Sequence, residues 1–214
     1  MDRLSVCVSA LMSALPAYLT LYPDDRALRR ALSDTATLTE LAREPITAST
    51  DPDWRLSLLE FEVGAGLPAD GHSSRNLLLL YGESVTLSGD SRGPDPVDVT
   101  IYGRGARWQG DAGIALTLGA AETRVLLQLT ARRDRHRVWT ALRPVVGSMV
   151  LFQEPGCEWL IQVINGGVQL RDARTLLELE SGNVLRIAFT DSTAPARVVL
   201  DGGGELAMFK LTPP

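Results

Sequence analysis

The densest group of ionisable side chains in this sequence is the stretch TARRDRHRVW, residues 130–139. Four arginines surround one aspartate and one histidine there. Guanidinium groups bind carboxylates and phosphates through paired N–H donors, so the stretch could anchor an anion. The chain as a whole carries a formal charge of −5, and an acidic protein repels the phosphate backbone of a nucleic acid. We therefore predict no nucleic-acid partner, and we weigh a small acidic ligand against a merely solvated strand end.

The residues before these arginines indicate how they are divided between two faces. If VLLQLTARR, residues 125–133, is an extended strand, successive side chains alternate between its faces. Gln128, Thr130 and Arg132 then share a polar face, whereas Arg133 follows the leucines on the opposite face. Arg132 and Gln128 are therefore candidate binding residues for a small carboxylate. Whether Arg132 or Arg133 points inward stays open.

Two further segments add candidate site residues. In WRLSLLEF, residues 54–61, Arg55 and Glu60 fall on opposite faces of a strand, so both line one cavity only if a β-bulge intervenes. Arg55 or Arg75 could complete the anion site through its guanidinium group. Glu60 is the candidate acid or base of an enzyme. The alternative is that these three residues and Asp111 form structural ion pairs at strand ends.

The sequence gives little support for a metal site or for a catalytic nucleophile. A metal site needs several convergent imidazole and carboxylate ligands, but the chain has only His72 and His136 and no His-x-His pair. His72 lies in a Gly/Ser-rich loop and His136 in the charged stretch, and we interpret both as loop residues. No GxSxG motif marks a serine nucleophile. We predict no metal and no cofactor.

The cysteines and the N-terminus indicate the compartment. Cys7 and Cys157 lie far apart and form no CxxC pair, which argues against a disulfide framework and favours a reducing environment. Residues 1–22 include an apolar run before Pro16 that is similar to a signal peptide, but Asp2 and interspersed serines weaken that interpretation. No apolar run reaches the roughly 18 residues that span a bilayer. We predict a cytoplasmic protein without a membrane partner.

The elements that must position the candidate residues have the pattern of strands. From Asp51 onward, short runs rich in Val, Leu and Ile are separated by Gly, Pro, Asp and Asn. More than ten such runs favour an all-β sandwich or barrel. The exception is residues 23–45, where Asp24 and Asp25 could cap a helix. We predict strands over residues 54–63, 76–82, 84–89, 97–103, 114–119, 123–133, 148–153, 158–166, 167–170, 175–182, 184–190, 196–202 and 205–211.

Two segments resemble each other. LLLLYGESVTLSG, residues 77–89, and LIQVINGGVQLRD, residues 160–172, each have the pattern of a strand, a glycine turn and a second strand. The turns would lie at Gly82 and Gly166. The likeness indicates an internal duplication, or else only the chemistry that hairpin turns share.

Four motifs in order resemble the HutD/Ves family. They are DPDWRLSLLEF at 51–61, SRNLLLLYGESVTL at 74–87, RWQGDAGIALTLG at 107–119 and LQLTARR at 127–133. The resemblance extends from about Leu19 to the C-terminus. The matching residues are Trp54, Arg55, Ser57, Glu60, Arg75, Gly82, Trp108, Gly110, Asp111, Arg132 and Arg133. Family members usually carry Trp-Lys-Asn-Gly-Gly-Gly where this chain has ALSDTA, residues 31–36, and Asn in place of Gln128.

The resemblance implies a bicupin, with two cupin-like β-barrels in one chain. We expect a short helical or irregular N-terminal extension over residues 1–50, a first barrel over 51–139 and a second over 140–214. It also implies a cytoplasmic protein linked to histidine utilisation or stress, without an established reaction. The glycines missing from residues 31–36 would have allowed the backbone to approach a ligand closely.

Three hypotheses about function follow. The first is non-catalytic binding of a small, acidic metabolite with a regulatory role, using Arg132, Gln128 and Arg55 or Arg75. The second is a metal-independent isomerase or lyase with Glu60 as its acid and base. The third is an interaction or oligomerisation module. The oligomeric state stays open, with a homodimer as one alternative.

Overall fold

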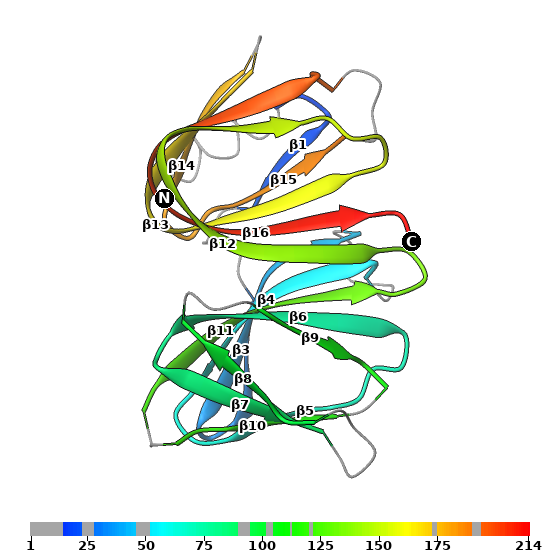
Figure 1. Cartoon of the computed structure of the whole chain (residues 1–214), viewed down its shortest axis with the longest axis vertical. Coiled ribbons are helices and arrows are strands. Elements are labelled where there is room, and N and C mark those ends of the chain that lie inside the picture. The colour runs from blue at the N-terminus through cyan, green and yellow to red at the C-terminus, as the bar shows by residue number, and fades with distance from the viewer. Residues whose placement is uncertain are drawn as a thin grey trace, which may run out of the picture. The chain divides into compact units, whose positions relative to one another are not determined.

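The computed structural model shows an all-β protein, with no helix in the part of the chain that it describes (Figure 1). It describes residues 15–22, 28–45, 52–89, 95–101, 105–111, 113–119, 122–172, 175–189 and 194–214. The strands are β1 (Leu19–Tyr22), β2 (Leu28–Ser33), β3 (Ala36–Glu44), β4 (Trp54–Phe61), β5 (Ala65–Leu67), β6 (Ser73–Tyr81), β7 (Ser84–Ser88), β8 (Val97–Thr100), β9 (Ala106–Gln109), β10 (Ile114–Thr117), β11 (Arg124–Arg132), β12 (Arg137–Phe152), β13 (Glu158–Arg171), β14 (Leu176–Glu180), β15 (Val184–Ala188) and β16 (Arg197–Thr212).

The predicted helix over residues 23–45 is wrong where the structure describes it. Residues 28–44 form β2 and β3 instead, and β3 pairs antiparallel with β4 from Ala36 to Glu44. Alanine, leucine, arginine and glutamate favour helices locally, but pairing with a buried neighbouring strand overrides that weak preference. The capping residues Asp24 and Asp25 lie outside the described residues.

The chain divides into two compact units. The central unit comprises residues 25–142 with 213–214, and the C-terminal unit comprises residues 1–24 with 143–212. These bounds differ from the expected barrels over 51–139 and 140–214, because β1, β2 and β3 supply strands to the sheets rather than an extension.

The central unit contains two sheets. One runs in the order β2-β3-β4-β11-β6-β9, and the other in the order β5-β10-β7-β8. Their apolar side chains form one core with fifteen buried residues, among which Leu59, Phe61, Trp108 and Leu126 are at most 2% exposed. Because strand side chains alternate between faces, the strands that build this core also fix which polar side chains point the same way.

The C-terminal unit contains a single six-stranded sheet. Its order is β1-β15-β13-β16-β12, and β14 also pairs with β13. A separate core includes Ile161, Leu185 and Leu206, all fully buried. The first strand of the chain, β1, contributes Leu19 and Leu21 to it.

The predicted turn at Gly166 is wrong. Residues 158–171 form the single strand β13, which pairs with β16 on both sides of this glycine, and the register shifts between Val163 and Asn165. Gly166 therefore lies inside a strand, where it pairs with Gly204 just after a β-bulge, and its φ is 73°. Gly82 instead connects β6 to β7, which lie in different sheets. The two glycines have different roles, so this feature does not support a duplication.

Replacing Gly166 by alanine is expected to lower the free energy of unfolding by about 1–3 kcal/mol, since a Cβ at positive φ is strained. That Cβ would also lie 2.8 Å from the Cα of Gly204, and closer still to the backbone oxygen of Gly203. Gly203→Ala is the matched control, because its Cβ would meet no atom within 4 Å. Urea denaturation measures both variants, and equal effects would contradict the strain expected at Gly166.

Candidate functional site

Polar side chains gather where the apolar core of the central unit ends. In the antiparallel register, Thr130 of β11 lies between Arg55 of β4 and Arg75 of β6. One pair further along, Gln128 lies between Ser57 and Leu77. Directly paired residues in a sheet point to the same face. The strands that carry Leu59 and Leu126 in the core thus carry a polar row at one end.

This polar row is buried and incompletely hydrogen-bonded. Gln128 is 2% exposed, and its Nε2 donates to Thr130 Oγ1 at 3.0 Å. Gln128 Oε1, Ser57 Oγ, Arg55 Nε and Arg75 Nε are buried and make no hydrogen bond in the described part of the chain. Buried polar atoms are nearly always hydrogen-bonded in proteins, so these atoms keep hydrogen-bonding capacity for water or a ligand.

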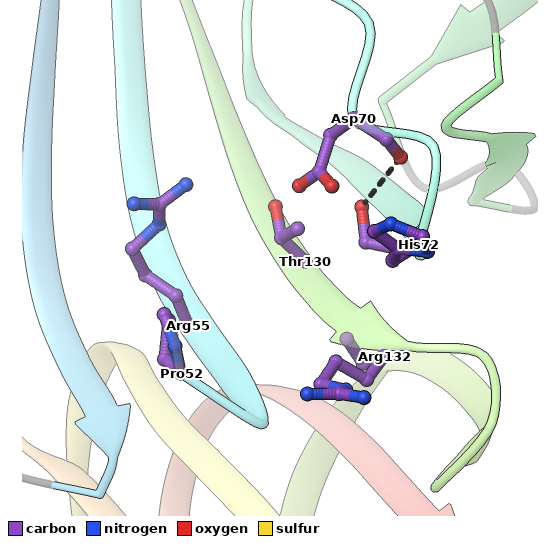
Figure 2. Close-up of a pocket in the computed structure, with 8 residues that line it drawn as sticks. Pro52, Arg55, Asp70, His72, Thr130 and Arg132 are labelled. Carbon is purple, nitrogen blue, oxygen red and sulfur yellow. Dashed lines mark hydrogen bonds between the residues drawn. The ribbon is translucent and has the colours of Figure 1, made fainter. Parts of the chain in front are cut away.

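A pocket of about 440 Å³ opens beside this row (Figure 2). It brings together β4, β11 and the loop that precedes β6. Its lining residues are Pro52, Arg55, Asp70, His72, Ser73, Thr130, Ala131 and Arg132.

Arg55 presents its guanidinium group to the pocket. It makes no hydrogen bond with the described residues and forms a long ion pair with Glu40, whose Oε2 is 3.9 Å from Nε. Its side chain is 27% exposed. A guanidinium offers five N–H donors in a planar fork that matches a carboxylate. Arg55 is therefore the side chain of this pocket best placed to receive an anion.

Arg75 lies beneath the pocket rather than in its lining. It is 6% exposed, and its NH2 group donates to the Pro68 carbonyl at 2.5 Å. Burial lowers the pKa of this guanidinium, while the charge of Asp70 acts in the opposite direction. An arginine nevertheless stays charged in proteins, so Arg75 adds positive potential near Asp70 and, through Pro68, fixes the start of the loop.

The two neighbouring arginines have different roles. Arg132 lines the pocket and forms two hydrogen bonds with Asp134, of 3.1 and 2.7 Å, and this pairing lowers the pKa of the Asp134 carboxyl. Arg133 turns away to Asp111, with bonds of 2.9 and 2.6 Å, and also donates to the Gly71 carbonyl. Arg132 is thus the arginine of this pair that faces the pocket.

The loop carrying Asp70 and His72 is fastened to the end of β9. Asp70 N donates to Gly110 O at 2.7 Å, and Gly110 N donates to Ser73 O at 2.9 Å. A Cβ on Gly110 would collide with the Asp70 carbonyl. Arg133 donates hydrogen bonds both to the Asp111 carboxylate and to the Gly71 carbonyl, and so links the two. We call this arrangement of Gly110, Asp111 and Arg133 the loop clamp. It gives the Gly-Asp and paired-arginine motifs a common physical role that the sequence alone did not reveal.

Glu60 is not part of this pocket. It lies on the other face of β4, is 42% exposed, and is 3.4 Å from Arg29. It lines a separate hollow of about 250 Å³ that also contains Arg29. Arg55 and Glu60 therefore do not share a cavity, as strand alternation predicted in the absence of a bulge at that point.

His72 and Asp70 are the site residues that sequence reasoning missed. His72 was interpreted as an exposed loop residue, and it is exposed, but it also lines the pocket. Asp70 follows no strand pattern, so the sequence does not mark it as a site residue. Its backbone bonds to Gly110 and Ser73 place it. A polar loop leading directly into a buried strand was the available signal.

Other side chains considered for chemistry lie elsewhere. Cys157 is 1% exposed, and burial raises the pKa of its thiol to about 11, so it is protonated at neutral pH and not a nucleophile. Cys7 and residues 1–14 lie outside the described residues. Within the described ranges, no group of three His, Cys, Asp or Glu side chains could hold a metal, and no helix could span a membrane.

Comparison with known proteins identifies similar chains. The model of the HutD family matches residues 35–208, while no curated protein matches significantly. A conserved protein of unknown function from Pseudomonas aeruginosa PAO1, PA5104, is 17% identical, with 91% of this chain and 98% of that chain covered and a TM-score of 0.77. HutD from Pseudomonas fluorescens SBW25 is 15% identical, with 92% and 99% covered and a TM-score of 0.72.

More distant chains share the fold alone. YhhW from Escherichia coli is 10% identical, with 92% of this chain and 98% of that chain covered and a TM-score of 0.64. The chain thus has a cupin-like all-β fold, as the resemblance implied.

Proposed function

The chain belongs to the HutD family, and from that premise we propose that it binds a small carboxylate-bearing metabolite in the pocket beside Arg55. The observation that carries this proposal is the Arg55 guanidinium, which lines the pocket and, among the described residues, makes no hydrogen bond and only a long ion pair with Glu40. A carboxylate there would receive paired, charge-assisted hydrogen bonds, each contributing about 1.5–3 kcal/mol.

The neighbouring groups support the same ligand class. Arg132 lies in the lining, and Thr130 offers a hydroxyl group next to buried Gln128. The buried charge of Arg75 adds positive potential to this region. A hollow pocket with converging arginines favours ligand binding over an interaction module with filled barrels. Glu60 lies outside the pocket, so an acid–base reaction at that residue is not part of the proposal.

The proposal extends to the role of the protein in the cell. Because Glu60 lies outside the pocket, the catalytic role considered for it loses its support, and we favour a regulatory, non-catalytic role in the cytoplasm. We also retain the bicupin arrangement, with each of the two units as a cupin-like barrel, as the architecture that would carry the pocket. The two separate cores and the similarity to HutD of Pseudomonas fluorescens SBW25 support this arrangement.

A thermal-shift screen tests the proposal, because a ligand that binds only the folded state raises the melting temperature. The screen contains histidine-pathway intermediates and other small mono- and dicarboxylates. At a ligand concentration of 100 Kd, binding adds about 2.7 kcal/mol of stability. We expect a shift with at least one acid, and a loss of that shift in Arg55→Met.

Arg29→Met is the matched control for the screen. Arg29 also belongs to the central unit and lines a hollow, but its side chain is 70% exposed and lies beside Glu60. The control should bind like the wild type. No shift with any acid, or equal shifts in wild type and Arg55→Met, would contradict carboxylate binding at Arg55.

A further inference from the structure

The pocket contains a carboxylate, that of Asp70, whose charge acts on buried Arg75 without a hydrogen bond between the two side chains. The side chain of Asp70 makes no hydrogen bond and no ion pair with the described residues, although it lies among arginines. Its backbone is held firmly, since Asp70 N donates to Gly110 and Asp70 O accepts from Ser73 N at 3.2 Å and from Ser73 Oγ at 3.4 Å. The carboxylate is therefore fixed in position by the main chain rather than by a salt bridge.

Arg55 carries the opposite charge and lines the same pocket from β4. It makes no hydrogen bond with the described residues, and its ion pair with Glu40 is long, with 3.9 Å between Nε and Oε2. Figure 2 shows the Arg55 guanidinium and the Asp70 carboxylate turned toward the same space, with Thr130 between them in this view. The two groups do not pair with each other. Both groups are partly exposed and keep hydrogen-bonding capacity toward the pocket, so a ligand that pairs with both must carry both signs.

We propose that the ligand is a zwitterion, an α-amino acid, whose carboxylate binds Arg55 and whose ammonium group binds Asp70. This inference rests on the proposed function and narrows its ligand class. A ligand with only carboxylates would place a negative charge near Asp70 and leave that group without a partner. The remaining lining includes Pro52 and Ala131, which offer apolar contacts, and the Thr130 hydroxyl, which offers a hydrogen bond to the amino-acid side chain.

The experiment compares amino acids with the same acids lacking the amino group. The pairs are glutamate and glutarate, aspartate and succinate, and histidine and imidazolepropionate, each measured by calorimetry on the full chain. We expect at least one amino acid to bind about tenfold or more tightly than its partner. Asp70→Asn should abolish this preference and leave binding of the partner acid unchanged or stronger. Arg55→Met should weaken both members of the pair.

Asp98→Asn is the matched control. It removes the same charge from β8 in the other sheet of the central unit, where Asp98 accepts a hydrogen bond from Thr86. This variant should keep the preference for the amino acid. Equal binding within every pair, or a preference that persists in Asp70→Asn, would overturn the zwitterion while leaving carboxylate binding intact. Failure of every compound to bind the wild type would overturn both proposals.

Discussion

Gly110→Ala is expected to lower the free energy of unfolding by about 2–3 kcal/mol and to weaken ligand binding at least tenfold. The added Cβ would overlap the Asp70 carbonyl and lie 2.7 Å from the Ser73 carbonyl. Both neighbours are backbone atoms, so the loop must move, and overpacking of this kind costs about 1–3 kcal/mol. The shift would also break the hydrogen bonds of Gly110 with Asp70 and Ser73.

The expected loss of affinity follows because this loop forms part of the pocket wall. Asp70 and His72 line the pocket, and a site displaced by about 1 Å loses much of its binding energy. Gly71→Ala is a control within the same loop, because its Cβ would meet nothing within 4 Å. Urea denaturation and calorimetric titration measure the two effects. If Gly110→Ala and Gly71→Ala behave alike, the loop clamp does not position the pocket.

Trp108→Ala is expected to lower the free energy of unfolding by about 3–5 kcal/mol, the range for deleting a buried aromatic side chain. Trp108 lies on β9, is 2% exposed, and belongs to the core of the central unit. Its indole Nε1 makes no hydrogen bond in the described part of the chain, so the loss reflects packing alone.

Trp139→Ala is the control for this second change. Trp139 is 45% exposed, and a surface substitution should change the free energy of unfolding by less than about 1 kcal/mol. Denaturation followed by far-UV circular dichroism compares the two variants. Similar losses of stability in both would show that the buried ring does not stabilise the central core.

The central strands could be predicted from the sequence because their pattern reflects burial. β4, β6 and β11 carry dense runs of leucine, and the structure places strands at all three predicted positions. Strand alternation also separated Arg55 from Glu60, and it grouped Gln128 with Thr130, which are hydrogen-bonded. Both results follow from the alternation of strand side chains every two residues, which can be seen in a single sequence.

The remaining strands and site residues depend on contacts between residues that are far apart in the sequence. Residues 28–44 form strands because β4 pairs with them, which their helix-favouring composition does not indicate. Residues 137–147 continue into β12, although only 148–153 were predicted as a strand. Asp70 reaches the pocket through bonds to Gly110, about 40 residues further along the chain. A local pattern can mark such a loop as polar, but it does not show which distant backbone the loop bonds to.

The pairing of β1 with β15 determines the order in which the two units can be completed during synthesis. All strands in the two sheets of the central unit lie within residues 28–132, so these sheets can form before the ribosome has made the rest of the chain. β1 emerges earlier, but its partner residues, 184–187, are made much later. Leu19 and Leu21 must stay without their core until then. β1 is thus made well before the strand it pairs with, and the sheet it joins is completed later than the sheets that carry the pocket.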